Sequence, residues 1–120
     1  MGRSQKQRTD GVVADYPENW PEIARLVKDA AGWRCVRCGH PHDVEAGYML
    51  TVHHLDMDKA NVAWWNLAAL CQRCHLSVQA RADWHQSYML AHSIWMRPYV
   101  EGYRLYLETG IVVTWREKWG

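Results

Sequence analysis

Residues 65–75 read WNLAALCQRCH, an apolar segment that runs directly into a C-x-x-C pair and a histidine. A second pair of the same type lies upstream, in CVRCG at residues 35–39. Two residues between cysteines let one tight turn direct both sulfurs at a single ion, and two such turns complete a tetrahedral shell. The spacing therefore predicts a closed structural zinc site formed by Cys35, Cys38, Cys71 and Cys74.

The four cysteines could also have a role without zinc. Each pair could be a redox-active dithiol, although the sequence does not show the thioredoxin-like βαβ pattern in which such motifs occur. All four could instead be free thiols of the core. His40 and His42 follow the first pair and could replace a ligand, but with four cysteines available we expect them to be loop residues.

Length and composition indicate one globular domain, because the 120 residues are 48% hydrophobic and 22% charged. The net charge of +1 gives no general attraction to nucleic acid, so a nucleic-acid-binding surface would have to be a local basic patch. Residues 1–10 lack the apolar segment of a signal peptide, and no apolar run is long enough to span a membrane. We therefore expect a cytoplasmic protein, where disulfides are rare.

The pattern of apolar residues predicts an α+β chain. Strands are expected at 48–53, where YMLTVH alternates, and around 66–70, and a helix is expected from about 73 to 82. We place the core of a single domain, residues 18–120, at 33–82.

The flanks of this core are predicted to be a basic arm and helices. Residues 1–17 are expected to form a flexible arm that carries Arg3, Lys6 and Arg8. A helix should follow, with Asn19 and Glu22 as a capping box, Pro21 in its first turn and Gly32 at its end.

Residues 83–120 are expected to form a helical C-terminal extension. Asp83 with Gln86 resembles a helix cap, and so does Thr114 with Glu117. Pro98 is expected to open a helix that Gly110 closes. Trp64 and Trp65 are expected to pack against the zinc knuckle.

Three stretches occur in an order that resembles the HNH endonuclease family: CVRC at 35–38, VHHLD at 52–56 and WNLAALCQRCH at 65–75. The likeness is closest to small HNH proteins encoded by phages and bacteria. Together the three motifs are specific, although each alone would be weak. The resemblance implies a ββα-metal, or His-Me finger, core that the four-cysteine zinc site holds together.

The resemblance also implies roles for four residues beside the second knuckle. His54 would be the general base, a task that suits a neutral imidazole because its ordinary pKa is about 6.5. His53 and His75 would be ligands of a catalytic divalent ion, separate from the structural zinc. Adjacent residues of a strand face opposite ways, so His53 and His54 can serve two roles. Asn66 would brace the loop that carries His54 and set the tautomer and direction of its ring, although it could equally be a turn cap.

The implied activity is metal-dependent hydrolysis of DNA phosphodiester bonds, leaving 5′-phosphate and 3′-hydroxyl ends. Mg²⁺ or Mn²⁺ is the expected ion, while histidine ligands also suit Ni²⁺, Co²⁺ or Zn²⁺. Arg37, Lys59 and Arg73 are the candidates for contacts to DNA phosphates, and a solubilising surface is their alternative role. Asp56 and Asp58 are expected in a solvated loop.

Two other functions remain open from the sequence. The chain could be a non-catalytic, zinc-stabilised module that binds DNA or a protein partner. It could also be the accessory nuclease of a phage DNA-packaging machine that cuts only with a phage or host protein partner, since the C-terminal extension exceeds what the motif requires. Neither the target sequence nor the oligomeric state follows from the residues.

Overall fold

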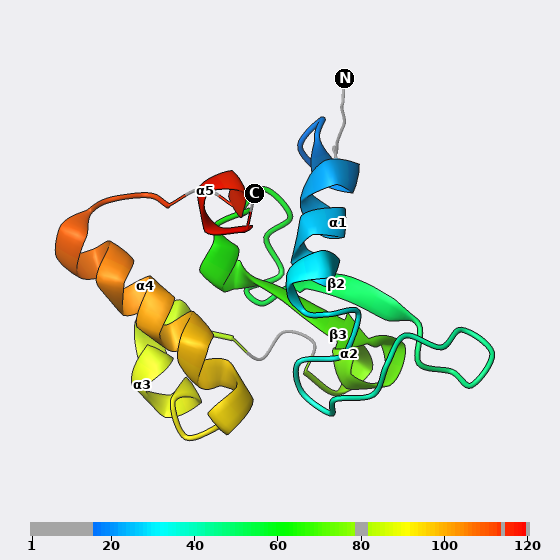
Figure 1. Ribbon diagram of the computed structural model, residues 1–120. Helices are drawn as coiled ribbons and strands as arrows, with labels where there is room; N and C mark the ends of the chain where they lie inside the picture. Colours follow the sequence, from blue (N-terminus) through cyan, green and yellow to red (C-terminus); the bar gives the residue numbers. More distant parts are fainter. Residues whose placement is uncertain (1–15, 79–81, 114, 120) are drawn as a thin grey trace, which may run out of the picture.

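The computed structural model describes residues 16–78, 82–113 and 115–119 of the chain (Figure 1). Nearly all of the expected basic arm, and the expected cap at Thr114, therefore lie outside the described residues. No described helix is both long enough and apolar enough to cross a membrane.

A two-stranded antiparallel sheet forms the centre of the structure. Strand β2 (Leu50–His54) pairs with β3 (Leu67–Cys71), in a register that sets Leu50 opposite Cys71 and His54 opposite Leu67. Helix α1 (Trp20–Ala30) and helix α2 (Gln72–Val78) each contact both strands. All five residues of β3 are buried, as expected for an apolar strand covered on both faces.

The predicted strands and the α2 helix are present, with shifted ends. Tyr48 pairs with Asp43 in an isolated bridge that closes the preceding loop, so β2 begins only at Leu50 and runs on through His54. Asn66 belongs to a 3₁₀ turn, η1 (Trp64–Asn66), and β3 therefore starts one residue later. Helix α2 is described as far as Val78, and Ala82 is not helical.

Helix α1 buries Ile23 and Val27 against the sheet, as its apolar spacing predicts. Its predicted capping box is wrong: Asn19 precedes the helix but makes no side-chain capping bond. The reason is its backbone, at φ −90° and ψ 21°, which lies outside the extended region that an N-cap side chain usually requires. Pro21 does occupy the first turn.

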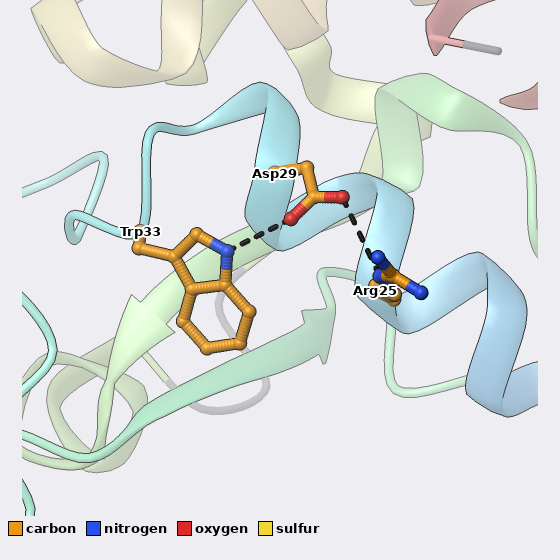
Figure 2. A network of polar contacts seen from close by, with 3 residues as sticks. All are labelled: Arg25, Asp29 and Trp33. Atoms are coloured by element: carbon orange, nitrogen blue, oxygen red, sulfur yellow. Dashed lines mark hydrogen bonds and ion pairs between the residues drawn. The ribbon is translucent and has the colours of Figure 1, made fainter.

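The chain leaves α1 through two left-handed residues, Gly32 at φ +64° and Trp33 at φ +58°. A left-handed tryptophan is strained, so its contacts must hold it there. Figure 2 shows that the Trp33 indole nitrogen donates to Asp29 Oδ1 at 2.8 Å, while Arg25 Nε lies 3.7 Å from the other oxygen of Asp29. This turn directs the chain from α1 into the first cysteine pair.

The C-terminal part is helical, as predicted. It contains η2 (Trp84–Gln86), α3 (Ser87–Leu90), η3 (Ile94–Met96), α4 (Arg97–Thr109) and α5 (Trp115–Trp119). Gly110, at φ +67°, closes α4 as expected, and the Asp83 side chain caps η2 by accepting from His85 N. Helix α4 packs on η1 and α5 packs on α1.

Trp64 and Trp65 contact the C-terminal helices, so the expectation that they pack against the zinc knuckle is wrong. The Trp65 ring meets Tyr103 at 5.1 Å between centroids, and Trp64 meets Trp119 of α5 at 6.3 Å. Gly102 makes this approach possible, because a Cβ atom there would overlap the Trp64 ring and lie 3.0 Å from Trp65 Cβ.

Gly102→Ala should therefore destabilise the protein, although alanine is the better helix former. The propensity gain is about 1 kcal/mol, whereas overpacking costs typically 1–3 kcal/mol. We expect a fall of roughly 1 kcal/mol in the free energy of unfolding, measured by urea denaturation. Glu101→Ala, an exposed neighbour on α4, is the matched control and should stay within about 0.5 kcal/mol of the wild type. A Gly102→Ala protein at least as stable as the control would contradict the close packing.

Candidate active site and metal centres

Four cysteines from three parts of the fold converge on one point. Cys35 and Cys38 lie in the turn after α1, Cys71 ends β3, and Cys74 is in the first turn of α2. Their sulfurs all lie within 4.8 Å of one another, and Cys38 Sγ is 3.8 Å from Cys71 Sγ. Zinc–sulfur bonds of about 2.3 Å in a tetrahedron place sulfurs about 3.8 Å apart, so the cluster could hold a zinc ion.

A redox dithiol or a set of core thiols fits this geometry less well than a zinc site. All four thiols are free, and a disulfide would need two sulfurs about 2.05 Å apart. A redox-active dithiol works within one C-x-x-C motif, so it does not require the two motifs to lie together. Cys38 is exposed, which an apolar core thiol would not be.

Backbone N–H groups and one guanidinium point at the sulfurs. Cys38 N and Cys74 N each donate to the first sulfur of their own pair at 3.5 Å, and Arg37 donates to Cys74 Sγ at 3.4 Å. Burial acts to raise the pKa of Cys35, but the backbone donors prevail and lower it to about 7. Burial, with further contributions from Cys35 and Cys71, raises the pKa of Cys74 to about 12 despite Arg37, so full ionisation of the cluster is unfavourable without a bound cation.

Loss of one zinc ligand should unfold the hairpin. Structural zinc contributes apparent binding free energies of about 10–16 kcal/mol in small domains. This is as large as the whole free energy of unfolding of a typical domain, about 5–15 kcal/mol. We expect Cys71→Ser to lose its zinc in elemental analysis and most of its helical circular dichroism. Ser77→Ala, an exposed change on the same helix, should keep one zinc ion per chain. A wild-type protein that stays folded with no zinc would contradict the assignment.

Three histidines lie around the β2–β3 hairpin, and the pleat divides them between two faces. The His53 ring lies against His75 of α2, with centroids 4.4 Å apart. His54 faces α1 instead, where its ring stacks on Trp20 at 4.8 Å, and Tyr16 stacks on the same tryptophan at 4.9 Å. Adjacent residues of a strand point opposite ways, which accounts for this division.

The hydrogen bonds around His53 and His75 indicate which of their ring nitrogens have a partner. Thr51 Oγ1 donates its single proton to Leu70 O at 2.8 Å, so it accepts from His75 Nδ1 at 3.1 Å. The His75 lone pair is therefore on Nε2. His53 Nε2 is buried and has no hydrogen-bond partner among the described residues. Burial lowers the pKa of His53 to about 4, with His75 and His54 adding to the effect, so its ring is neutral near pH 7.

His54 is also buried, at 5% exposure, and its Nε2 has no hydrogen-bond partner in the described part of the chain. Burial lowers its pKa, while Asp56 and Asp58 act in the opposite direction. A neutral imidazole with an unused nitrogen can accept a proton from water, once water reaches it.

Asn66 is fully buried and uses its whole amide. Its Nδ2 donates to Asp56 Oδ1 and to Asn61 O, both at 2.9 Å. Its Oδ1 accepts from Asp56 N at 3.2 Å and from Trp84 Nε1 at 2.9 Å, and its backbone oxygen accepts from Leu55 N at 2.8 Å. Asn66 thus holds the two residues that follow His54, whereas none of these bonds reaches the His54 ring.

Asp56 is part of a hydrogen-bond network that the sequence did not predict. Instead of lying free in a solvated loop, its carboxylate accepts from Asn66, from Asn61 Nδ2 at 2.9 Å and from Asp58 N at 2.9 Å. The signal was available in the D-x-D spacing, because an Asp side chain commonly bonds the backbone two residues on. Trp84 was missed as well, and nothing in its local sequence indicates its bond to Asn66.

The three candidate DNA-binding cations each have a partner within the fold. Arg37 donates to Cys74 of the cysteine cluster. Arg73 donates to Gly47 O and Ala46 O and lies over the Tyr48 ring at 4.4 Å. Lys59 Nζ lies 4.9 Å from the centre of the Tyr16 ring, beside the aromatic stack on His54. Of these three cations, Lys59 is the one that lies against the rings stacked on His54.

The comparison with known proteins identifies the class of domain. Residues 35–81 match the family model described as HNH endonuclease, and this range contains both cysteine pairs, the three histidines and Asn66. No curated protein and no solved structure matches the chain. This segment is therefore an HNH domain. Such domains commonly bind DNA and generally act as nucleases, although many are non-catalytic.

Proposed function

We propose that the chain is a metal-dependent DNA endonuclease in which His54 is the general base and His53 and His75 hold one divalent ion. The observation that carries the proposal is the group of histidines at the end of β2. There, Nε2 of His53 and Nε2 of His54 are buried and lack partners among the described residues, and the ring of His75 lies beside His53, within a segment that matches the HNH family.

In this proposal His54 takes a proton from the attacking water through Nε2. Its lowered pKa keeps the ring neutral and able to accept a proton at physiological pH. Asn66 acts behind it, because its bonds to Leu55 and Asp56 fix the backbone from which the His54 ring projects.

His53 and His75 approach each other from β2 and α2, and a divalent ion between them would stabilise negative charge on the scissile phosphate. With only two protein ligands, the ion would keep positions open for phosphate and water. We propose Mg²⁺ or Mn²⁺ for this site. The zinc cluster is a separate, closed site that holds α1, β3 and α2 in place.

DNA would approach where Lys59 lies beside the His54 stack, with Arg37 and Arg73 as further phosphate contacts. The low net charge of +1 means that binding depends on such local cations. We further propose that residues 18–120 act as one nuclease domain, with the core at 33–82 and an extension at 83–120, in the cytoplasm of a bacterial cell.

The His54 environment also favours the non-catalytic alternative in one respect. Trp20 and Tyr16 cover the ring, so neither water nor phosphate reaches Nε2 in this conformation. An active enzyme has to move these covering rings when DNA binds, whereas a binding module has no such requirement.

Plasmid cleavage separates these functions. The zinc-loaded wild type should nick or linearise supercoiled plasmid with Mg²⁺ or Mn²⁺ and stop when EDTA is added. His54→Ala should lose at least about 100-fold in rate, since general-base catalysis contributes typically 10²–10⁴-fold. His92→Ala, an exposed histidine of the C-terminal extension, is the matched control and should cut like the wild type.

A folded, zinc-loaded wild type that cuts with none of Mg²⁺, Mn²⁺, Ni²⁺ or Co²⁺ would contradict the proposal. DNA binding without cleavage would then support the binding module. Cleavage only after co-expression with phage proteins would support the accessory nuclease.

Thr51→Val should weaken the catalytic ion site while leaving the zinc site intact. Valine keeps the shape of threonine but removes the acceptor that fixes His75 Nδ1–H, so the ring loses its tautomer preference. We expect Mn²⁺ affinity, measured by electron paramagnetic resonance, to fall by roughly 10-fold. Thr51→Ser should restore it, and His75→Ala should abolish it. Equal Mn²⁺ affinity in the valine variant and the wild type would show that Thr51 does not orient His75.

A further inference from the structure

Trp84 connects the C-terminal extension to the centre of the HNH segment. It lies beyond the matched residues 35–81, in η2, and is 8% exposed. Its indole nitrogen donates to Asn66 Oδ1 at 2.9 Å, in a bond that is buried at both ends. A buried hydrogen bond between groups from separate parts of the chain costs most when only one partner is removed.

The bond is one of four hydrogen bonds that fix which way the Asn66 amide faces. An indole N–H can only donate, so the atom it meets must be the amide oxygen. Asp56 N, the other donor on this side, meets the same oxygen at 3.2 Å, a longer contact than the 2.9 Å of Trp84. A flipped amide would set two donors against Nδ2 and two acceptors, Asp56 Oδ1 and Asn61 O, against Oδ1.

The orientation of this amide in turn holds the loop that follows His54. Both Asp56 N and Asp56 Oδ1 are bonded to Asn66, and Asp56 also accepts from Asn61 and Asp58. Asp56 is two residues after His54, whose own oxygen accepts from Met57 N at 2.9 Å. A rotation of the Asn66 amide would therefore disturb the hydrogen bonds of Asp56, and through them the backbone next to His54.

The Trp84 ring packs against one aromatic ring of the extension and one of η1. It stacks on Tyr103 of α4 at 5.1 Å and meets Trp65 edge-on at 5.3 Å. The capped turn at Asp83 fixes its backbone. The indole nitrogen is thus directed by packing from α4, and its position does not depend on Asn66 alone.

We propose that Trp84 is a positioning residue of the nuclease site, which locks the Asn66 amide so that the 55–61 loop holds His54 in place. The inference rests on the proposed nuclease function for its effect on rate, and on geometry alone for its effect on Asn66. It makes the C-terminal extension a part of the site and not an appended module.

The test compares Trp84→Phe with Trp95→Phe in the full-length, zinc-loaded protein. Both changes shrink a tryptophan of the extension, but Trp95 Nε1 has no hydrogen bond among the described residues, so only Trp84→Phe removes a donor to Asn66. Trp84→3-benzothienylalanine, which replaces the N–H by sulfur in a ring of the same shape, covers the case in which the phenylalanine variant fails to fold. The readouts are the melting temperature, kcat and KM for plasmid, and the ¹⁵N–¹H signals of the Asn66 side-chain amide.

We expect kcat to fall about 10- to 100-fold in the Trp84 variants with little change in KM, as for loss of a group that orients a catalytic residue. The Asn66 amide signals should shift and broaden or double. Trp95→Phe should change neither. Equal kcat in the Trp84 and Trp95 variants, at whatever melting temperature, would overturn the effect on rate.

The amide signals keep the inference testable if the nuclease proposal itself fails. A wild type that never cuts would refute the proposed function, yet altered Asn66 signals in the Trp84 variants would still support the positioning. Unchanged, single Asn66 signals in those variants would overturn it, whether or not the wild type is active.

Discussion

Four cysteine sulfurs within 4.8 Å of one another impose the constraint on which the other parts of the structure depend. Full ionisation of such a cluster is unfavourable without a cation at its centre, because burial, together with the neighbouring Cys35 and Cys71, raises the pKa of Cys74 to about 12. A bound zinc ion would remove this penalty and, at the same time, fix the turn after α1, the end of β3 and the start of α2 relative to one another. His75 follows Cys74 directly, so the position of the proposed second metal ligand is set by the same site.

The hairpin places a proposed metal ligand, His53, next to a proposed general base, His54, at the end of one strand. The period of two in β2 sends His53 towards α2 and His54 towards α1. Each face adds its own support: Thr51 holds His75 on one side, and the Trp20 stack covers His54 on the other. The second arrangement restricts access, because the covering rings must move before Nε2 can meet water.

The described part of the C-terminal extension packs on the HNH segment at Trp64, Trp65 and Trp84. Gly102 allows the backbone of α4 to reach the Trp64 ring, and Tyr103 beside it stacks on Trp84. The Trp84 bond to Asn66 then carries this packing into the loop after His54. Aromatic residues that composition alone assigns to a core thus also supply a specific hydrogen bond.

The sequence by itself determined the four cysteines that could hold zinc, the α+β class, the order of the main helices and strands and the match of residues 35–81 to the HNH family, because each depends on the spacing of residues along the chain. It also predicted the closing of α4 at Gly110, since a left-handed residue there requires little beyond glycine. The absent cap at Asn19, the bond from Asn66 to Asp56, the cover over His54 and the bond from Trp84 were decided only by the tertiary structure. Each of these depends on how residues distant in the chain approach one another, which packing sets and local pattern does not encode.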